Sequence, residues 1–210
     1  MKKFLIALAL TGCASGALAQ IGITAGMNLA KYSYAQKRFD VHRKSILGYN
    51  FGVQYKQRLS EKWFLLPELS YALKGARVYY DYPIGATGPM KDVNRFQYLQ
   101  LNLPVVLALP ISDAFDFEVG AGLFAACLLK ATQKTVEFDD SYATRSFASG
   151  DLKKMDAGLS FTTGFRMSKM LGLHFSYNLG LVNIQQQASA PTARTRNFSI
   201  NLSWIFSKND

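Results

Sequence analysis

The chain has 210 residues, of which 49% are hydrophobic, 13% are aromatic and only 18% are charged. This length fits one domain of ordinary size or two small ones. The aromatic and glycine content, with so few charges, excludes a disordered chain and a coiled coil. The formal net charge of +10 would suggest nucleic-acid binding in an intracellular protein.

The N-terminus has the three parts of a secretory signal peptide in the usual order. Met1-Lys2-Lys3 is basic, Phe4 to Leu10 is apolar, and Ala17-Leu18-Ala19 is an A-x-A cleavage site. We therefore predict a cleaved signal peptide over residues 1–19 and one mature domain over residues 20–210. Because an exported chain meets little nucleic acid, we expect no nucleic-acid partner.

A second interpretation of the leader stays open. Leu10-Thr11-Gly12-Cys13 resembles a bacterial lipobox, in which a lipidated Cys13 would become the first mature residue. If Cys13 instead leaves with the signal peptide, Cys127 is the only remaining cysteine and no intramolecular disulfide can form.

Apolar and polar residues alternate with period two through most of the mature chain, which is typical of strands with one apolar and one polar face. In the last of these segments, Phe198, Ile200 and Leu202 alternate with small polar residues. The alternation predicts eight strands: Ile21–Leu29, Tyr49–Arg58, Trp63–Lys74, Tyr98–Leu107, Phe115–Cys127, Asp156–Met167, Leu171–Leu181 and Arg196–Phe206.

The connections between these strands alternate in length. Three are short turns: Ser60–Lys62, Pro110–Ala114 and Ser168–Met170. Four are long and polar: Lys31–Leu47, Arg77–Asn94, Thr132–Lys154 and Asn183–Thr195. Short periplasmic turns and long extracellular loops are typical of an outer-membrane barrel. We predict an all-β fold, an eight-stranded antiparallel up-and-down transmembrane β-barrel.

A soluble lipocalin-type barrel or an antiparallel sandwich is the competing architecture. Two features favour the membrane. The polar faces carry small or charged residues, and aromatic residues gather at strand ends as interfacial girdles do. These aromatic residues are Tyr49, Trp63, Tyr98, Trp204 and Phe206. We therefore expect the protein in the outer membrane.

Several segments resemble the PorT-like outer-membrane β-barrel family of Bacteroidetes. The most specific is Leu66–Gly75, which is similar to the family's x-P-E-L-x-Y-x-x-K-G strand. Tyr98–Pro104 and Tyr177–Ile184 resemble two further strands of that family. The resemblance implies an eight-stranded barrel in a Gram-negative outer membrane, and some members are linked to secretion or gliding machinery. It implies no catalytic residues.

The alternation directs seven charged side chains inward. An eight-stranded barrel has a lumen that side chains just fill, and buried charges must be paired. We expect an internal network that makes the barrel rigid, with a proton or ion path as the alternative. The seven residues are Lys56, Arg58, Glu68, Lys74, Glu118, Asp156 and Arg166.

Catalytic chemistry has little support in the sequence. Only His42 and His174 are present, and Ser176 lies two residues from His174 with no third group evident. We expect no enzyme, no cofactor and no metal site.

The first long connection is rich in basic residues. Lys37, Arg38, Arg43 and Lys44 suggest contact with lipopolysaccharide phosphates or with an acidic partner. At the other end of the chain, Trp204 and Phe206 close an amphipathic last strand, as expected for a signal to the barrel-assembly machinery.

These observations predict a non-enzymatic structural or interaction component, for example of a secretion or surface-assembly system. A small-solute channel is the first alternative, and a lipid A-modifying enzyme at the rim is the second.

Overall fold

The computed structural model describes residues 19–34, 41–80, 90–136, 142–146, 152–167, 170–186 and 192–206. These residues form ten β-strands: β1 (Ala19–Tyr34), β2 (Val41–Arg58), β3 (Trp63–Leu65), β4 (Glu68–Tyr80), β5 (Met90–Ser112), β6 (Phe115–Val136), β7 (Tyr142–Ser146), β8 (Met155–Met167), β9 (Leu171–Gly180) and β10 (Ala193–Phe206). Within these ranges, no helix combines the length and the apolar character needed to cross a membrane. The predicted signal peptide, Cys13, Lys37 and Arg38 lie outside the described residues, apart from Ala19 at the start of β1.

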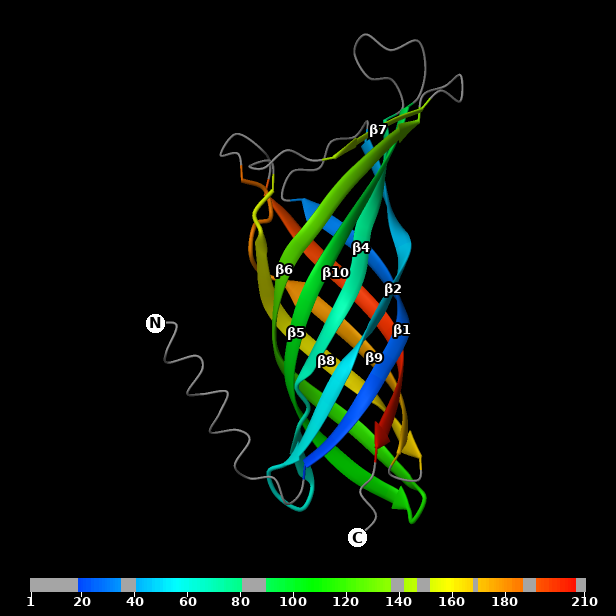
Figure 1. Cartoon of the computed structure of the whole chain (residues 1–210), viewed down its shortest axis with the longest axis vertical. Coiled ribbons are helices and arrows are strands. Elements are labelled where there is room, and N and C mark those ends of the chain that lie inside the picture. Colours follow the sequence, from blue (N-terminus) through cyan, green and yellow to red (C-terminus); the bar gives the residue numbers. More distant parts are fainter. Residues whose placement is uncertain are drawn as a thin grey trace.

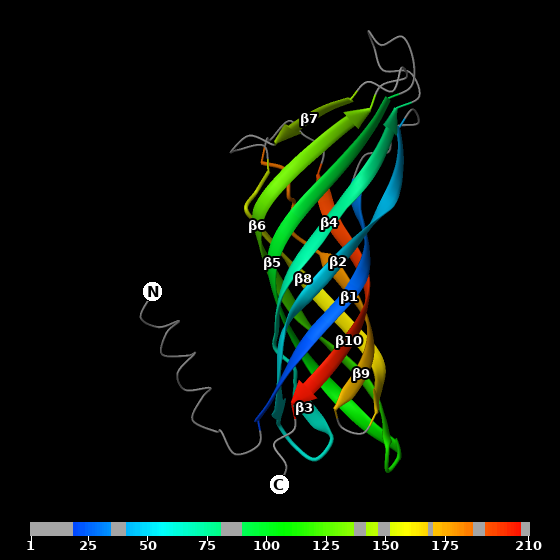
Figure 2. The ribbon, with the colours of Figure 1, turned by 45° about the vertical axis from the view of Figure 1, so that its right-hand side comes forward.

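Eight of the strands close into a ring. Figures 1 and 2 show the barrel from two sides. The order is β1-β2-β4-β5-β6-β8-β9-β10, and β10 pairs with β1 to close it. Every neighbouring pair is antiparallel. Closure leaves no sheet edge in the ring unpaired, which a sheet in lipid requires. The predicted eight-stranded up-and-down fold is confirmed.

The predicted strand Trp63–Lys74 is divided in two. β3 ends at Leu65 and β4 begins at Glu68. The break falls at Pro67, which has no backbone N–H for the ladder, although its carbonyl still accepts from the Tyr55 amide at 2.9 Å. β3 pairs with both β2 and β5, so the divided strand keeps its place in the wall.

The strands run further toward one end of the ring than the sequence predicts. β5 has 23 residues and β6 has 22, and both enter segments expected to be long loops. Apolar alternation stops where the outer surface becomes polar, whereas the backbone ladder continues beyond that level. The predicted loop boundaries are therefore wrong over Lys31–Tyr34, Val41–Leu47, Arg77–Tyr80, Met90–Asn94, Thr132–Val136, Tyr142–Ser146 and Ala193–Thr195. We call the end of the ring that these longer strands reach the loop end. The opposite end, which has the turns at residues 59–62 and 113–114, is the turn end.

The surface of the ring has the reverse of a soluble protein's polarity. Along β10, Ile200, Leu202 and Trp204 are exposed, whereas Asn201 and Ser203 are buried. An exposed apolar band with a polar interior is suited to lipid, because hydrocarbon solvates only the apolar side chains. Four predicted girdle aromatics are about half exposed: Tyr49, Trp63, Trp204 and Phe206.

The prediction of an aromatic girdle is wrong for Tyr98. Its side chain is 1% exposed and faces the interior. It lies on the same face of β5 as buried Phe96 and Gln100, so its parity in the strand, rather than its aromatic character, decides its direction.

Candidate functional site in the barrel interior

Charged side chains from four strands meet near the turn end of the interior. The period-two alternation turns Lys56 of β2, Glu118 of β6, Arg166 of β8 and His174 of β9 inward, and all four are buried. Glu118 lies at the centre. Its Oε1 accepts from Arg166 Nε at 2.7 Å and from Lys56 Nζ at 3.3 Å. Its Oε2 accepts from Arg166 Nη2 at 3.0 Å and lies 2.8 Å from His174 Nε2. We call these residues the Glu118 cluster.

Besides the imidazole, the cluster contains one carboxylate, one guanidinium group and one amino group. The two hydrogen bonds from Arg166 make the ion pair bidentate, the strongest geometry available to a guanidinium. Arg166 Nη1 is buried without a hydrogen-bond partner among the described residues. Arg166 also lines a vestibule of about 290 Å³, together with Lys56, Arg58 and Asp116. Opposite charges and a solvated vestibule together offset the cost of burying these ions.

Two glycines make room for the imidazole of His174. A Cβ at Gly172 would lie 2.6 Å from His174 Cε1 and 2.5 Å from Ser203 Oγ. A Cβ at Gly164 would lie 2.8 Å from His174 Cδ2. Contacts this short would force the ring away from Glu118.

The remaining predicted interior charges do not join the cluster. Lys74 Nζ donates to Gln100 Oε1. Asp156 Oδ2 accepts from Thr195 Oγ1 at 2.7 Å, and Glu68 Oε1 accepts from an Asn102 amide at 3.5 Å. Gln100 Nε2 also donates to Asn102 Oδ1 at 2.7 Å, so Lys74 and Glu68 belong to one hydrogen-bonded chain, whereas Asp156 and Thr195 form a separate contact.

Arg58 is a correction to the predicted set. It is exposed at the end of β2, where its Nε donates to the Ser60 carbonyl at 3.2 Å. The alternation extends to Arg58, but the wall ends at the turn, so its side chain lines the mouth of the vestibule and is exposed to solvent.

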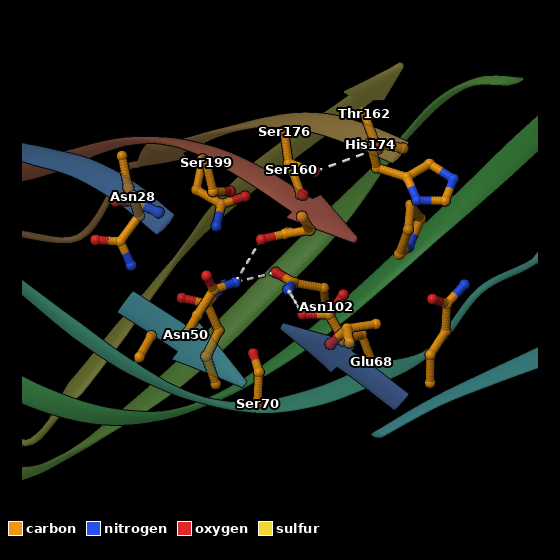
Figure 3. Close-up of a pocket in the computed structure, with 18 of the residues that line it drawn as sticks. Asn28, Asn50, Glu68, Ser70, Asn102, Ser160, Thr162, His174, Ser176 and Ser199 are labelled. Atoms are coloured by element: carbon orange, nitrogen blue, oxygen red, sulfur yellow. Dashed lines mark hydrogen bonds between the residues drawn. The ribbon is translucent and has the colours of Figure 1, made fainter. Parts of the chain in front are cut away.

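A polar cavity of about 40 Å³ lies within the barrel, lined mainly by amide and hydroxyl side chains. Figure 3 shows Asn50, Glu68, Ser70 and Asn102 around it. Asn50 Nδ2 donates to Asn201 Oδ1 at 2.8 Å. Since one water needs about 10–15 Å³ on this scale, the cavity has room for only a few waters.

Apolar side chains fill the interior on the loop-end side of this cavity. They come from β1, β4, β5, β6 and β10 and from the segments next to β8 and β9. Tyr32 and Phe96 pack with ring centroids 5.3 Å apart, and Lys74 Nζ lies 5.2 Å from the Phe124 centroid. We call this cluster the apolar plug: Tyr32, Ala76, Phe96, Tyr98, Phe124, Ala126, Leu152, Ile184 and Ala193.

The plug was not predicted from the sequence. Its signal is present nonetheless, since Phe96, Phe124 and Ala126 occupy inward positions of the period-two pattern. An apolar residue at an inward position of a barrel with an apolar outside marks a section of lumen from which water is excluded.

Ser203, His174 and Glu118 form a chain of contacts that the sequence did not predict. Ser203 Oγ lies 3.4 Å from His174 Nδ1, and Glu118 contacts the other ring nitrogen. This order matches nucleophile, base and orienting acid. Ser203 is buried and lines neither of the two cavities described above. The structure places Ser176 beside Thr162, at 3.2 Å between the hydroxyls.

Two of the four basic residues of the first predicted loop lie in a strand. Arg43 and Lys44 belong to β2. Lys44 faces outward and Arg43 the opposite way, opposite buried Val78 in β4. At the other end of the chain, Trp204 and Phe206 are exposed and pair with Ile23 and Ile21 of β1, where the ring closes.

The described residues contain no group of three or more His, Cys, Asp or Glu side chains placed to hold a metal ion. Among the described residues, Cys127 is a free cysteine, and its side chain is partly buried. It lies on β6 between Leu99 and Met155 of the neighbouring strands.

Comparison with family models identifies the chain. The model of the outer membrane protein beta-barrel domain matches residues 14–186, most of the sequence. The chain belongs to this family. The protein is therefore an outer-membrane β-barrel, and its turn end faces the periplasm, as in barrels of this class. No curated protein matches the chain.

Solved outer-membrane barrels have similar folds at low identity. Ail, the attachment invasion locus protein of Yersinia pestis, is 12% identical with a TM-score of 0.45, over 90% of this chain and 99% of that one. Neisserial surface protein A is 13% identical with a TM-score of 0.47, over 90% and 99%. OprG from Pseudomonas aeruginosa is 14% identical with a TM-score of 0.42, over 90% and 97%.

Proposed function

We propose that this outer-membrane barrel is closed to solutes and acts as a non-enzymatic structural or interaction component of the cell surface. The observation that supports this is the obstruction of the interior at two levels. The apolar plug fills the loop-end section, and the Glu118 cluster spans the section near the periplasm.

The proposed interaction role is supported by the strands that continue beyond the apolar band. β5 and β6 reach the loop end together, and β7 pairs with the last residues of β6. A rigid extension of paired strands can present side chains to a partner with little loss of conformational freedom. The PorT-like resemblance of Leu66–Gly75 favours a secretion or surface-assembly partner in a member of the Bacteroidetes.

Three further assignments belong to this proposal. Residues 1–19 are removed as a signal peptide on export, and residues 20–210 form the mature barrel. Trp204 and Phe206 are contacts for the barrel-assembly machinery. Lipopolysaccharide surrounds the outer half of the wall.

The closed interior is tested by conductance in planar lipid bilayers. We expect purified, folded protein to show no current above that of protein-free membranes. Steady single-channel steps would contradict the closed barrel and favour a small-solute channel. The observation behind that second candidate is the polar cavity, where Asn28, Asn178 and Asn197 each have a buried amide oxygen without a partner among the described residues.

The interaction role is tested by a crosslinked pull-down from solubilised outer membranes. We expect enrichment of a secretion, motility or surface-lipoprotein component over a sample in which an unrelated outer-membrane barrel carries the tag. Recovery of the assembly machinery alone would contradict the interaction role. A lipid A-modifying activity would change lipid A masses on overexpression.

A further inference from the structure

Basic side chains cover the outer wall of β2, β4 and β5 at the loop end. Lys44, Arg77, Lys91 and Arg95 occupy outward positions, because the residues that alternate with them in β4 and β5, such as Val78, Asp92 and Phe96, are buried. Lys44 and Arg95 are exposed, and Arg77 and Lys91 are partly exposed. We call these four residues the basic wall.

Three of the four cations of the basic wall, Lys44, Arg77 and Lys91, are close neighbours across the strands. Lys44 is directly opposite Arg77 in the β2–β4 ladder. Tyr79 is opposite Lys91 in the β4–β5 ladder. Lys44 Nζ and Lys91 Nζ lie 5.3 Å and 6.0 Å from the centroid of the Tyr79 ring. Like charges placed directly opposite in a sheet are destabilising, so the free protein bears a cost that a bound anion would relieve.

Tyr79 reports the positive potential of this surface. Its hydrogen bond with Arg77 is the main cause that lowers the pKa of the Tyr79 hydroxyl, and the charges of Arg77, Lys91 and Lys44 lower it further. These charges stabilise a phenolate oxygen here, and they would stabilise any other oxyanion at the same place.

Carboxylates of the described chain do not neutralise the wall. Asp92, which follows Lys91 directly, faces the interior and accepts from Thr135 Oγ1 at 2.7 Å. Every ion pair between described residues involves Glu118, inside the barrel near the other end.

The basic wall begins where the apolar band ends. On β5, the outward residue Leu99 is exposed to lipid. The next outward residues toward the loop end are, in order, Gln97, Arg95, Val93 and Lys91. At about 3.3 Å per residue along a strand tilted by about 40°, Arg95 lies roughly 10 Å and Lys91 roughly 20 Å above Leu99, in the polar layer outside the hydrocarbon. Phosphate is the anion at that depth in an outer leaflet built from phosphorylated glycolipid. Guanidinium groups bind it with paired hydrogen bonds, and ammonium groups bind it as point charges.

We propose that Lys44, Arg77, Lys91 and Arg95 form a binding surface for the phosphorylated headgroup of lipid A on the outer wall of β2, β4 and β5. This deepens the proposed function, since it assigns a lipid contact to the strands rather than to the predicted loop, and it rests on the outer-membrane location alone. Its failure would leave the closed interior and the protein partner of the pull-down experiment unaffected.

The test measures binding of bisphosphorylated lipid A to the folded full chain in detergent micelles, with dephosphorylated lipid A and inorganic phosphate as comparison probes. We expect Lys44→Gln/Arg77→Gln/Lys91→Gln to weaken binding of bisphosphorylated lipid A at least about tenfold, since each cation near an anionic lipid surface adds a separable contribution. The matched control, Lys62→Gln/Lys153→Gln/Lys154→Gln, removes the same charge from exposed sites elsewhere and should bind like the wild type.

Three results would overturn the proposal. The first is equal binding of lipid A by the wall variant and the control. The second is equal binding of phosphorylated and dephosphorylated lipid A by the wild type. The third is displacement of lipid A by millimolar inorganic phosphate, which would indicate a free-anion site. Folding of each variant is checked by heat-dependent gel migration. Should the triple variant fail to fold, wild-type affinity that does not change with salt concentration would contradict a phosphate contact.

Discussion

Glu118 and Arg166 form a bidentate ion pair between neighbouring strands, although they are not directly opposite each other. In the β6–β8 ladder the residue opposite Arg166 is Asp116, and the residue opposite Glu118 is Gly164. Gly164 has no side chain to separate the pair, so the guanidinium reaches the deeper carboxylate at 2.7 and 3.0 Å.

Removing the central carboxylate should destabilise the barrel. Glu118→Gln removes the carboxylate with which the buried Lys56 and Arg166 form their ion pairs, and a buried charge that loses its partner costs about 3–5 kcal/mol. The free energy of unfolding, measured by urea titration of the folded protein in lipid or detergent, should fall by about that amount. Glu61→Gln, at an exposed turn position, is the control and should change it little. Equal effects of the two substitutions would show that the Glu118 cluster does not stabilise the interior.

The apolar plug should matter more for stability than apolar residues facing lipid. Phe124 is 2% exposed, and Phe124→Ala should cost about 3–5 kcal/mol in the free energy of unfolding because it leaves a cavity. Phe165 is 41% exposed, and Phe165→Ala should cost clearly less, since lipid fills the space. If both variants unfold at the same urea concentration, the plug does not pack as tightly as the structure shows.

Gly172 should be coupled energetically to His174. Gly172→Ala would place a methyl group 2.6 Å from His174 Cε1 and push the ring from Glu118, at a cost of about 1–3 kcal/mol for overpacking. The same substitution in a His174→Ala background should cost less, because the imidazole is no longer displaced and only the contact with Ser203 Oγ at 2.5 Å remains. A double-mutant cycle of unfolding free energies measures this difference. An additive cycle would contradict the proposed contact.

The end of β10 should affect assembly more than its middle. Phe206 is exposed at the last described position of the strand, and Phe206→Ala should lower the amount of heat-modifiable barrel in the outer membrane several-fold. Leu202→Ala changes a residue that is exposed on the same face of β10 and serves as the matched control. Equal amounts of the two variants would count against an assembly signal at Phe206.

The alternation of side chains alone determined the number of strands in the ring, the closed sheet and the direction of most side chains, but neither the break between β3 and β4 nor β7. The strand has a period of two, so each inward position can be read from its neighbours, as Glu118, Lys56 and His174 illustrate. The prediction from the alternation was wrong about the strand ends in β5 and β6, where the backbone ladder continues beyond the apolar pattern. It was also wrong about the burial of Arg58, where the wall ends.

Only the tertiary structure decided which inward groups meet. Glu118 and Lys56 are 62 positions apart in the chain, and Glu118 and His174 are 56 apart. Their contact depends on the register of strands around the ring, and a one-residue shift would turn a whole strand over. The apolar plug and the basic wall depend in the same way on the heights at which strands pair. The sequence alone determined which face of its strand each residue occupies. The height at which residues of neighbouring strands meet was determined only by the pairing of the strands in the closed barrel.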